Sequence, residues 1–330
     1  MFELDDNGLD GLDYLAYVKI IGVGNGGCIS LNRFINMGLS GVEFIAMNTD
    51  AQSLMKSLAP KRLQIGEKIT PRSDNSSNTR IDERSAQYSQ DDIMAAIGKP
   101  DMVFIVATLG DNVGSERTPM VASHAKDTGA LTVAIVTLPF IGEGPSRKRT
   151  VEDSLAKIKE SVDTVIAINS ERFFAGEKDI EDNPDSTFEI DKLIAEAIQG
   201  IVNLISEPGL INLDFADVQL ILKNSRTAVV GIGTGTGENA SIEAVMEAAA
   251  LPMFDESIKY AQSIIINITG SDDKLSIFEV NEAVEAILKM TVSNVNIIWG
   301  ASIDNNLGDT VKATIIASGF DEEKCNHKNS

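Results

Sequence analysis

Short, almost continuously apolar segments alternate with helical patterns along the first half of the chain. They cover residues 18–23, 42–47, 101–106, 131–136 and 164–168. Strands that are apolar at nearly every position are buried on both faces, which is typical of a parallel sheet with helices on either side. The sequence therefore predicts an α/β fold in which ligands bind at the carboxyl ends of the strands.

A long helix is predicted between this half and the rest of the chain. Ser186 and Glu189 have the spacing of a capping box, and apolar residues recur at helical spacing between positions 193 and 205. Apolar side chains on so much of the circumference indicate a helix packed between two domains. The predicted organisation is a flexible lead-in at 1–16, a nucleotide-binding domain at 17–180, a connecting helix at 186–207, a smaller α/β domain at 208–320 and a flexible tail at 321–330.

The composition of the chain limits the kinds of molecule that it is expected to bind. The 330 residues carry 28 basic and 49 acidic side chains, a net charge of −21. This charge argues against binding to nucleic acid and against direct docking on an anionic membrane. Signal-peptide features and apolar runs of roughly 18–20 residues are absent from the sequence. Cys28 and Cys325 suggest neither a disulfide framework nor a metal site. We expect a cytoplasmic protein.

The first predicted strand runs into the residues Gly-Val-Gly-Asn-Gly-Gly. Because Gly24, Gly26 and Gly27 lack side chains, they and Asn25 can bring backbone N–H groups close to a phosphate at a helix N-terminus. Taken alone, the pattern also fits a dinucleotide-dependent oxidoreductase, with Glu43 as the ribose ligand. It fits equally a glycine turn that only tightens the packing of helix on strand.

A set of further motifs resembles the FtsZ branch of the tubulin superfamily, from about residue 17 to 320. The matching segments are 22–32, 41–52, 64–70, 129–133, 137–140, 208–217 and 237–239. The block 208–217, which reads Pro-Gly-Leu-Ile-Asn-Leu-Asp-Phe-Ala-Asp, has no place in an oxidoreductase, so that alternative becomes remote. The resemblance implies the FtsZ/tubulin-like arrangement of a parallel-sheet nucleotide-binding domain, a long connecting helix and a smaller C-terminal domain. It also implies head-to-tail filaments.

Asn212, Asp214 and Asp217 match the loop with which that family reaches into a neighbouring subunit's nucleotide. The resemblance implies that the two aspartates act on a water at the terminal phosphate, and it allows Mg²⁺ beside them. Phosphoryl transfer needs orientation and charge more than covalent chemistry from the protein. From the residues alone, Asp214 also fits a helix N-cap with Asp217 in the favourable first turn. The two roles are compatible.

The main phosphate-binding loop departs from the family. Where the family has a glycine-rich loop, residues 110–116 read Gly-Asp-Asn-Val-Gly-Ser-Glu. Only Gly110 and Gly114 keep glycine, and Ser115 stands in for a threonine hydroxyl. Asp111 and Glu116 are expected to place negative charge where phosphates should lie. At an effective dielectric near 20 and a distance of ~5 Å, each would cost roughly 3 kcal/mol before screening.

The neighbouring loops depart in the same way. Cys28 and Ile29 replace a glycine and an asparagine of the family, and residues 75–77 replace glycines, although Asn78 remains. A side chain at such positions pushes the backbone away from phosphate or excludes positive φ. Asn48, at the carboxyl end of the second strand, keeps its match. We therefore expect phosphate binding to be weakened at three loops together.

Other residues of the predicted pocket match the family in position. Glu143 and Arg147 correspond to a pair beside the nucleotide, and Phe188 resembles the aromatic residue that packs on the base. Ser170 replaces a purine-binding asparagine. Asp191 is placed to read the N1–H and amino group of guanine, in a register that is one residue shorter here. From the residues alone, Phe188 also fits a core position and Asp191 a solvated helix position.

A second glycine run, at 231–237, looks like a phosphate cradle but precedes a helix of the second domain. By comparison with the family, we expect a turn remote from nucleotide.

The leading prediction is a divergent FtsZ-like cytoskeletal protein that forms head-to-tail filaments, alone or with a conventional FtsZ. Its own binding of GTP or GDP would be weakened or lost, so GTPase activity is left open. The alternative is a conventional GTP-hydrolysing FtsZ of cell division that binds GTP despite its unusual phosphate loops.

Overall fold

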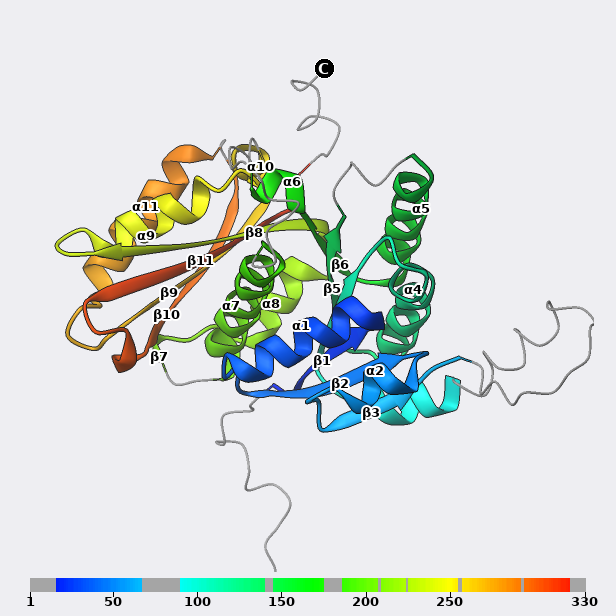
Figure 1. Cartoon of the computed structure of the whole chain (residues 1–330). Helices are drawn as coiled ribbons and strands as arrows, with labels where there is room; N and C mark the ends of the chain where they lie inside the picture. Colours follow the sequence, from blue (N-terminus) through cyan, green and yellow to red (C-terminus); the bar gives the residue numbers. More distant parts are fainter. Residues whose placement is uncertain are drawn as a thin grey trace, which may run out of the picture.

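The computed structural model describes residues 16–66, 90–139, 145–174, 186–206, 209–223, 225–254, 257–291 and 294–320. These residues form a continuous 11-stranded sheet with helices on its faces (Figure 1). The strand order is β3-β2-β1-β4-β5-β6-β8-β11-β9-β10-β7. The predicted α/β class is confirmed.

The first six strands form a parallel half-sheet. They are β1 (Val18–Val23), β2 (Val42–Asn48), β3 (Lys61–Gln64), β4 (Met102–Thr108), β5 (Leu131–Leu138) and β6 (Thr164–Asn169). Every pairing among them is parallel. All six residues of β1 are buried, because helices cover both faces, as the continuous apolar pattern predicts.

Helices divide between the two faces of this half-sheet. Those outside the long connecting helix are α1 (Gly24–Asn36), α2 (Ala51–Met55), a helix at 90–97, α4 (Asn112–Asp127), α5 (Pro145–Ser161) and α6 (Ser170–Phe173). Alternate residues of β1 and β4 enter separate cores. Ile20 and Phe104 pack on the α1 face, whereas Ile21 and Ile105 pack with apolar residues of α4 and α5. This alternation follows from the two-residue period of a strand.

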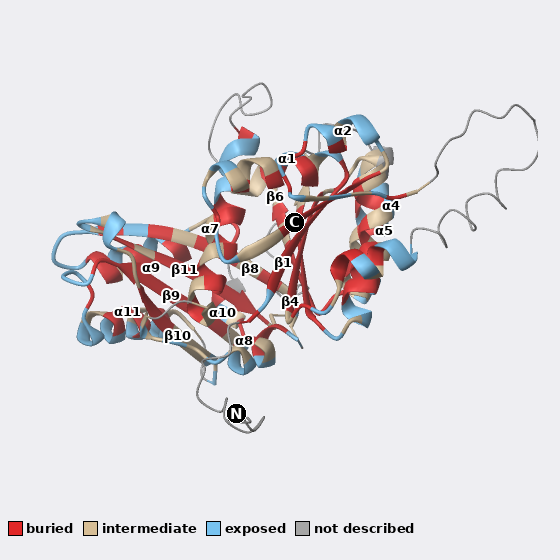
Figure 2. Ribbon diagram, turned by 90° about the horizontal axis from the view of Figure 1, so that it is seen from below, coloured by how far each residue is buried: buried red, intermediate tan, exposed pale blue. Residues whose placement is uncertain are grey.

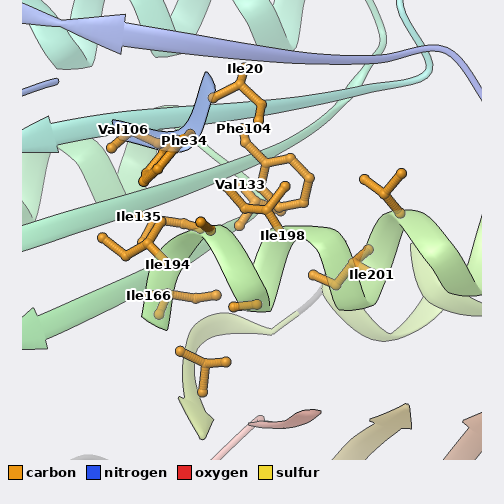
Figure 3. Packing of buried hydrophobic residues seen from close by; sticks show 14 of the residues in the cluster. Ile20, Phe34, Phe104, Val106, Val133, Ile135, Ile166, Ile194, Ile198 and Ile201 are labelled. Carbon is orange, nitrogen blue, oxygen red and sulfur yellow. The ribbon is translucent and has the colours of Figure 1, made fainter. Parts of the chain in front are cut away.

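The connecting helix α7 (Ser186–Ser206) lies against the same face as α1 (Figure 1). Its side chains Ile194, Ile198 and Ile201 pack toward the strands and Phe34 of α1 (Figure 3). Its other side contacts the second half of the molecule. There the Lys312 ammonium lies 2.8 Å from a carboxylate oxygen of Glu196 on α7.

The second half contains β7 (Gly209–Ile211), α8 (Phe215–Leu222), β8 (Arg226–Thr236), α9 (Ala240–Ala249), α10 (Ser257–Tyr260), β9 (Ser263–Gly270), α11 (Ile277–Met290), β10 (Asn296–Ile303), η2 (Asn305–Leu307) and β11 (Thr310–Ser318). The start of β8 pairs in parallel with β6, which joins the two half-sheets. β11 then runs antiparallel between β8 and β9. Figure 2 shows the strands largely buried and the outer turns of α11 exposed. The domain limits predicted from the sequence remain a prediction.

The glycine run at 231–237 differs from expectation, because most of it lies within β8 and not in a turn. Its glycines let α9 approach the strand closely. A Cβ atom on Gly233 would lie 2.2 Å from the carbonyl oxygen of Ala244 and 2.4 Å from the amide nitrogen of Ala248. A Cβ on Gly235 would lie 2.0 Å from the carbonyl oxygen of Ala240. The backbone of α9 fills the space that a phosphate would need.

This packing predicts that Gly233→Ala destabilises the protein. The new methyl group meets backbone atoms that cannot rotate away, and overpacking of this kind costs about 1–3 kcal/mol. Urea unfolding measures the free energy of unfolding. The control is Thr236→Ala on the exposed end of the same strand, which we expect to change that free energy by no more than about 0.5 kcal/mol. Equal stability of the two variants would contradict the packing argument.

Candidate functional site

A cavity of about 310 Å³ opens at the carboxyl ends of β4 and β5. This volume is at the lower end of the range of roughly 300–1,000 Å³ typical of ligand pockets. Its walls come from α1, the two strand ends, α5, α6 and the first turns of α7. The strand order reverses between β1 and β4, and such a switch point is where open α/β sheets bind ligands.

The glycines at the start of α1 are held by close packing. Gly24 has a φ of +75°, which favours glycine, and a Cβ there would lie 2.9 Å from the amide nitrogen of Gly114. A Cβ on Gly26 would lie 2.2 Å from the hydroxyl of Thr108, and one on Gly27 would lie 2.4 Å from a carbonyl oxygen of β4. Close packing of helix on strand is therefore sufficient reason for these glycines. Of the three, the cavity wall includes Gly26.

Asn25 and Asn48 bond to each other next to this turn. The amide of Asn48 donates to the side-chain oxygen of Asn25 at 2.7 Å, and the carbonyl of Asn48 accepts the N–H of Ile65 at 2.9 Å. Asn48 is fully buried. Cys28 is buried beside this pair, and burial raises the pKa of its thiol to about 11. It is therefore an unreactive thiol at neutral pH.

The phosphate-type loop forms its hydrogen bonds internally. Asp111 is the N-cap of α4, and its carboxylate accepts the N–H of Gly114. Its carbonyl accepts the N–H of Ser115 at 3.1 Å, and the Ser115 hydroxyl accepts the N–H of Gly110 at 2.9 Å. A phosphate at this helix N-terminus would compete with the Asp111 carboxylate for the Gly114 N–H. A phosphate bound there would have to replace this hydrogen bond.

The two acidic residues of this loop, Asp111 and Glu116, differ in their exposure to solvent. Burial raises the pKa of Asp111, although Arg147 nearby and the N–H groups of Gly114 and Ser115 oppose the rise. Glu116 is exposed to solvent on α4, where its charge is screened. Arg147 lines the cavity and lies over Gly110, so that a Cβ on that glycine would be 2.7 Å from Nε. Of the two acidic residues of this loop, Asp111 is the less exposed and the one that interacts with Arg147.

Asp191 lines the cavity and is 4% exposed. One carboxylate oxygen accepts the hydroxyl of Ser30 at 2.6 Å, and the other forms an ion pair with Arg33. Burial raises the pKa of Asp191, and these two donors oppose the rise. The solvated position allowed by the sequence is therefore wrong, since Asp191 is bonded inside the cavity wall.

Two further predicted base contacts are found in different surroundings. Ser170 is buried on the cavity wall, and its hydroxyl donates to the carbonyl of Leu138 at 2.8 Å. Phe188 is 41% exposed, with the guanidinium of Arg33 5.9 Å from its ring centre. A core position for Phe188 is therefore excluded. Asn78 and Glu143 lie outside the described residues.

The loop at 212–217 lies on the surface. The side chains of Asn212, Asp214 and Asp217 are exposed. Asp214 is the N-cap of α8, accepting the N–H of Ala216 at 3.0 Å, and Asp217 lies in the first turn. The Asn212 side chain accepts the N–H of Gly209 at 2.7 Å, which fixes the loop. The predicted capping role of Asp214 is confirmed, and the side chains of Asp214 and Asp217 are both exposed to solvent.

The cavity and this loop are at opposite ends of α7. Thr187, Ile190 and Asp191 of its first turns line the cavity, whereas the loop follows its last turn. The helix has 21 residues, and a rise of 1.5 Å per residue makes it about 30 Å long. The packing of its buried residues holds this helix between the cavity and the loop. The structure separates the predicted site into two parts.

Ser30 and Arg33 were not predicted as site residues. Both lie on one face of α1, three positions apart, as the helical period requires. Arg33 and Asp191 are 158 residues apart in sequence, so the spacing of residues gives no sign of their contact. The contact between Arg33 and Asp191 can be predicted only once α1 and α7 are known to be adjacent.

Two features are absent from the described ranges. No group of three or more His, Cys, Asp or Glu side chains there is placed to hold a metal ion. None of the helices there is long and apolar enough to cross a membrane.

The pKa of Asp111 predicts the effect of Asp111→Asn on stability. A raised pKa means that the folded protein prefers the neutral form, so ionised Asp111 lowers stability as the pH rises above its ordinary value of 3.8. Asparagine is as good an N-cap. We expect Asp111→Asn to be at least as stable as wild type at pH 7 in urea unfolding, with a smaller advantage at pH 4.5.

The matched control is Asp50→Asn at the N-cap of α2. Hydrogen bonds from Ser53 and from the N–H groups of Gln52 and Ser53 lower the pKa of Asp50. Its ionised form therefore stabilises the fold above the ordinary pKa, and that stabilisation is lost as the pH falls through the folded pKa. We expect Asp50→Asn to be less stable than wild type at pH 7, and by a smaller amount at pH 4.5. This effect is opposite in sign to the one expected for Asp111→Asn. A loss of stability in Asp111→Asn at pH 7 would contradict the prediction.

Comparisons with known proteins agree with this geometry. The model of the Tubulin/FtsZ family GTPase domain matches residues 17–176, and that of the FtsZ family C-terminal domain matches residues 226–321. An FtsZ dimer without ligand from M. jannaschii is 36% identical, with a TM-score of 0.81, over 93% of this chain and 89% of that one. A point mutant of the same FtsZ is also 36% identical, with a TM-score of 0.81, over 92% and 91% of the two chains.

A more distant similarity extends to CetZ from Methanosaeta thermophila. It is 18% identical, with a TM-score of 0.73, over 93% of this chain and 88% of that chain. At this identity the match concerns the fold alone. The identity to FtsZ over nearly the whole length, the similarity of the structures and the two matching domain models together show that this chain belongs to the FtsZ family of tubulin-like cytoskeletal GTPases.

Proposed function

We propose that this chain is a filament subunit that binds GTP or GDP weakly or not at all, and whose 212–217 loop acts on nucleotide held by the next subunit. That subunit is a second copy or a conventional FtsZ. The observation that carries the proposal is the division of the site between the two ends of α7. A loop about 30 Å from its own cavity can serve only the cavity of another molecule.

The exposed apolar residues support head-to-tail contact. Ile29 is 52% exposed and lines the cavity. Leu210 and Leu220 are 39% and 65% exposed around the 212–217 loop. These two surfaces are made of different residues and lie at opposite ends of α7. Two unlike surfaces that bind each other form a heterologous interface, and its repetition gives a filament when the rotation does not close into a ring.

The chemistry of the loop supports action across such a contact. Asp214 and Asp217 are exposed carboxylates held on the first turn of α8. When a nucleotide is bound by the neighbour, its terminal phosphate supplies the electrophile. The carboxylates then orient and polarise a water, which is the type of assistance that phosphoryl transfer requires.

The contacts of Asp111 support weak nucleotide binding by the chain itself. Its carboxylate already occupies the N-terminus of α4, and its negative charge repels a triphosphate. The alternative, a conventional GTP-hydrolysing FtsZ, is favoured by one observation. Arg147 lines the cavity near Asp111, and its positive charge offsets part of that repulsion.

Asp111→Asn is predicted to bind GTP roughly tenfold more tightly than wild type. Removing one charge at ~5 Å changes the interaction by about 3 kcal/mol at a dielectric of 20, and screening leaves about half of that. Titration calorimetry measures both affinities. The matched control is Glu116→Gln, which removes a charge of the same sign from an exposed position and should have a smaller effect. Micromolar or tighter binding by wild type would favour the conventional GTPase.

Asp214→Asn separates the capping role from the proposed catalytic role. Asparagine caps a helix as well as aspartate does, so α8 and assembly should be preserved, but the charge is lost. We expect phosphate release by filaments mixed with a conventional FtsZ, with this chain in excess, to fall about a hundredfold. Sedimentation with and without GTP reports assembly in parallel.

The control for this experiment is Asp272→Asn, on an exposed turn of the second half. It should leave both phosphate release and sedimentation unchanged. If Asp214→Asn co-sediments normally and phosphate release also stays at the wild-type rate, the loop does not act across the contact. Failure of wild type to sediment alone or with the conventional FtsZ would exclude the filament itself.

A further inference from the structure

The end of β8 has a neighbouring strand on one side only, in the part of the chain that the structure describes. β8 pairs with β11 from Ala228 to Thr236, whereas its pairing with β6 stops at Ala228. Beyond that junction β8 continues to the far end of the second half (Figure 1). Thr234 and Thr236, near its end, are exposed. A strand edge of this kind presents N–H and C=O groups to which another strand can add.

Two glutamates of α9 accept the N–H groups of this edge. A side-chain oxygen of Glu247 accepts both the N–H and the hydroxyl of Thr234. A side-chain oxygen of Glu243 accepts the N–H of Thr236 at 3.4 Å. Because antiparallel strands bond to each other at alternate residues, these two N–H groups point away from β11. The carboxylates therefore take the place that a neighbouring strand would have.

The spacing of the two glutamates matches the spacing of the N–H groups that they accept. Glu243 and Glu247 are four residues apart on one face of α9, a rise of about 6 Å. The two threonines are two residues apart on the strand, a rise of about 7 Å. Gly233 and Gly235 lie between and beside them, and their missing Cβ atoms let the backbone of α9 approach β8 closely. The close approach brings both carboxylates to the edge of the strand.

The strand itself carries no charge that would hinder pairing. Residues 229–236 read Val-Val-Gly-Ile-Gly-Thr-Gly-Thr, which is rich in β-branched residues. The strand β3, at one edge of the whole sheet, differs because it carries Lys61 and Arg62. Charged side chains on an edge strand hinder the addition of another strand. At the end of β8 the charge comes from the neighbouring helix.

We propose that Glu243 and Glu247 prevent the free end of β8 from pairing with the same strand of another copy of this chain. A second copy is the partner that the geometry favours, because two identical edges can pair antiparallel about a two-fold axis. Such pairing needs the N–H groups of Thr234 and Thr236, which the carboxylates occupy. It would also bring four negative charges together.

This inference does not depend on the nucleotide site. If the chain forms filaments, as proposed above, the edge recurs in every subunit. Weak pairings between two filaments would then add along their length. The two glutamates would keep such filaments separate.

The test compares wild type with Glu243→Ala combined with Glu247→Ala, in the full chain without nucleotide. Water can solvate the exposed N–H groups of the two threonines, so we expect this variant to fold, and its melting temperature checks this. Hydrogen exchange by mass spectrometry, in dilute and in concentrated protein, reports pairing at residues 233–237. We expect exchange there to slow by roughly tenfold in the concentrated variant. In wild type it should not depend on concentration.

The matched control is Glu282→Ala combined with Glu285→Ala. It removes two negative charges from exposed positions of α11 and leaves the edge of β8 covered. Glu243→Gln combined with Glu247→Gln removes the charges but keeps an oxygen that can accept each N–H. Exchange at residues 233–237 should be independent of concentration in both variants, as in wild type.

The inference is overturned if exchange at residues 233–237 in the folded alanine pair is as independent of concentration as in wild type. It is overturned equally if the glutamine pair or the α11 control responds as the alanine pair does, since loss of charge alone would then explain the association. If the alanine pair does not fold, Glu247→Ala alone is measured, and the same criterion applies. The filament proposal is judged separately, by sedimentation and by Asp214→Asn.

Discussion

The burial of α7 between the two halves is the interaction on which the rest of the structure depends. Its isoleucines pack on the parallel half-sheet, and a Cβ on Gly200 would lie 2.8 Å from the hydroxyl of Thr314 on β11. The amide of Asn267 donates to the carbonyl of Gly200 at 3.1 Å. One buried helix therefore sets the distance between the cavity and the 212–217 loop.

The polar groups in and beside the cavity form hydrogen bonds within the protein. Buried N–H groups and carboxylates are almost always hydrogen-bonded. Asp111 and Ser115 supply acceptors for N–H groups of the loop, and Ser30 and Arg33 supply donors for Asp191. At both ends a ligand must therefore replace an existing bond as well as form a new one.

Much of the architecture was predictable from the residues. The apolar runs predicted the parallel strands, because a two-sided cover of helices requires continuous burial. Helical spacing of apolar residues predicted α7, and Asp214 was predicted as an N-cap. The glycine run at 231–237 was placed in a turn and proved to lie mostly in β8. A run of glycines indicates that another group approaches the backbone closely, but it does not identify that group. Here the group is the backbone of α9.

The sequence by itself determined the fold class, the family and the identity of the residues that bear charge near the site, because these depend on local periodicity and on motifs of fixed spacing. The tertiary structure alone decided which of those charges meet. Asp191 and Arg33 are separated by 158 positions, and only the packing of α1 beside α7 brings them into contact. The same holds for the separation of Asp214 from the cavity, which is set by the length and rigidity of a buried helix.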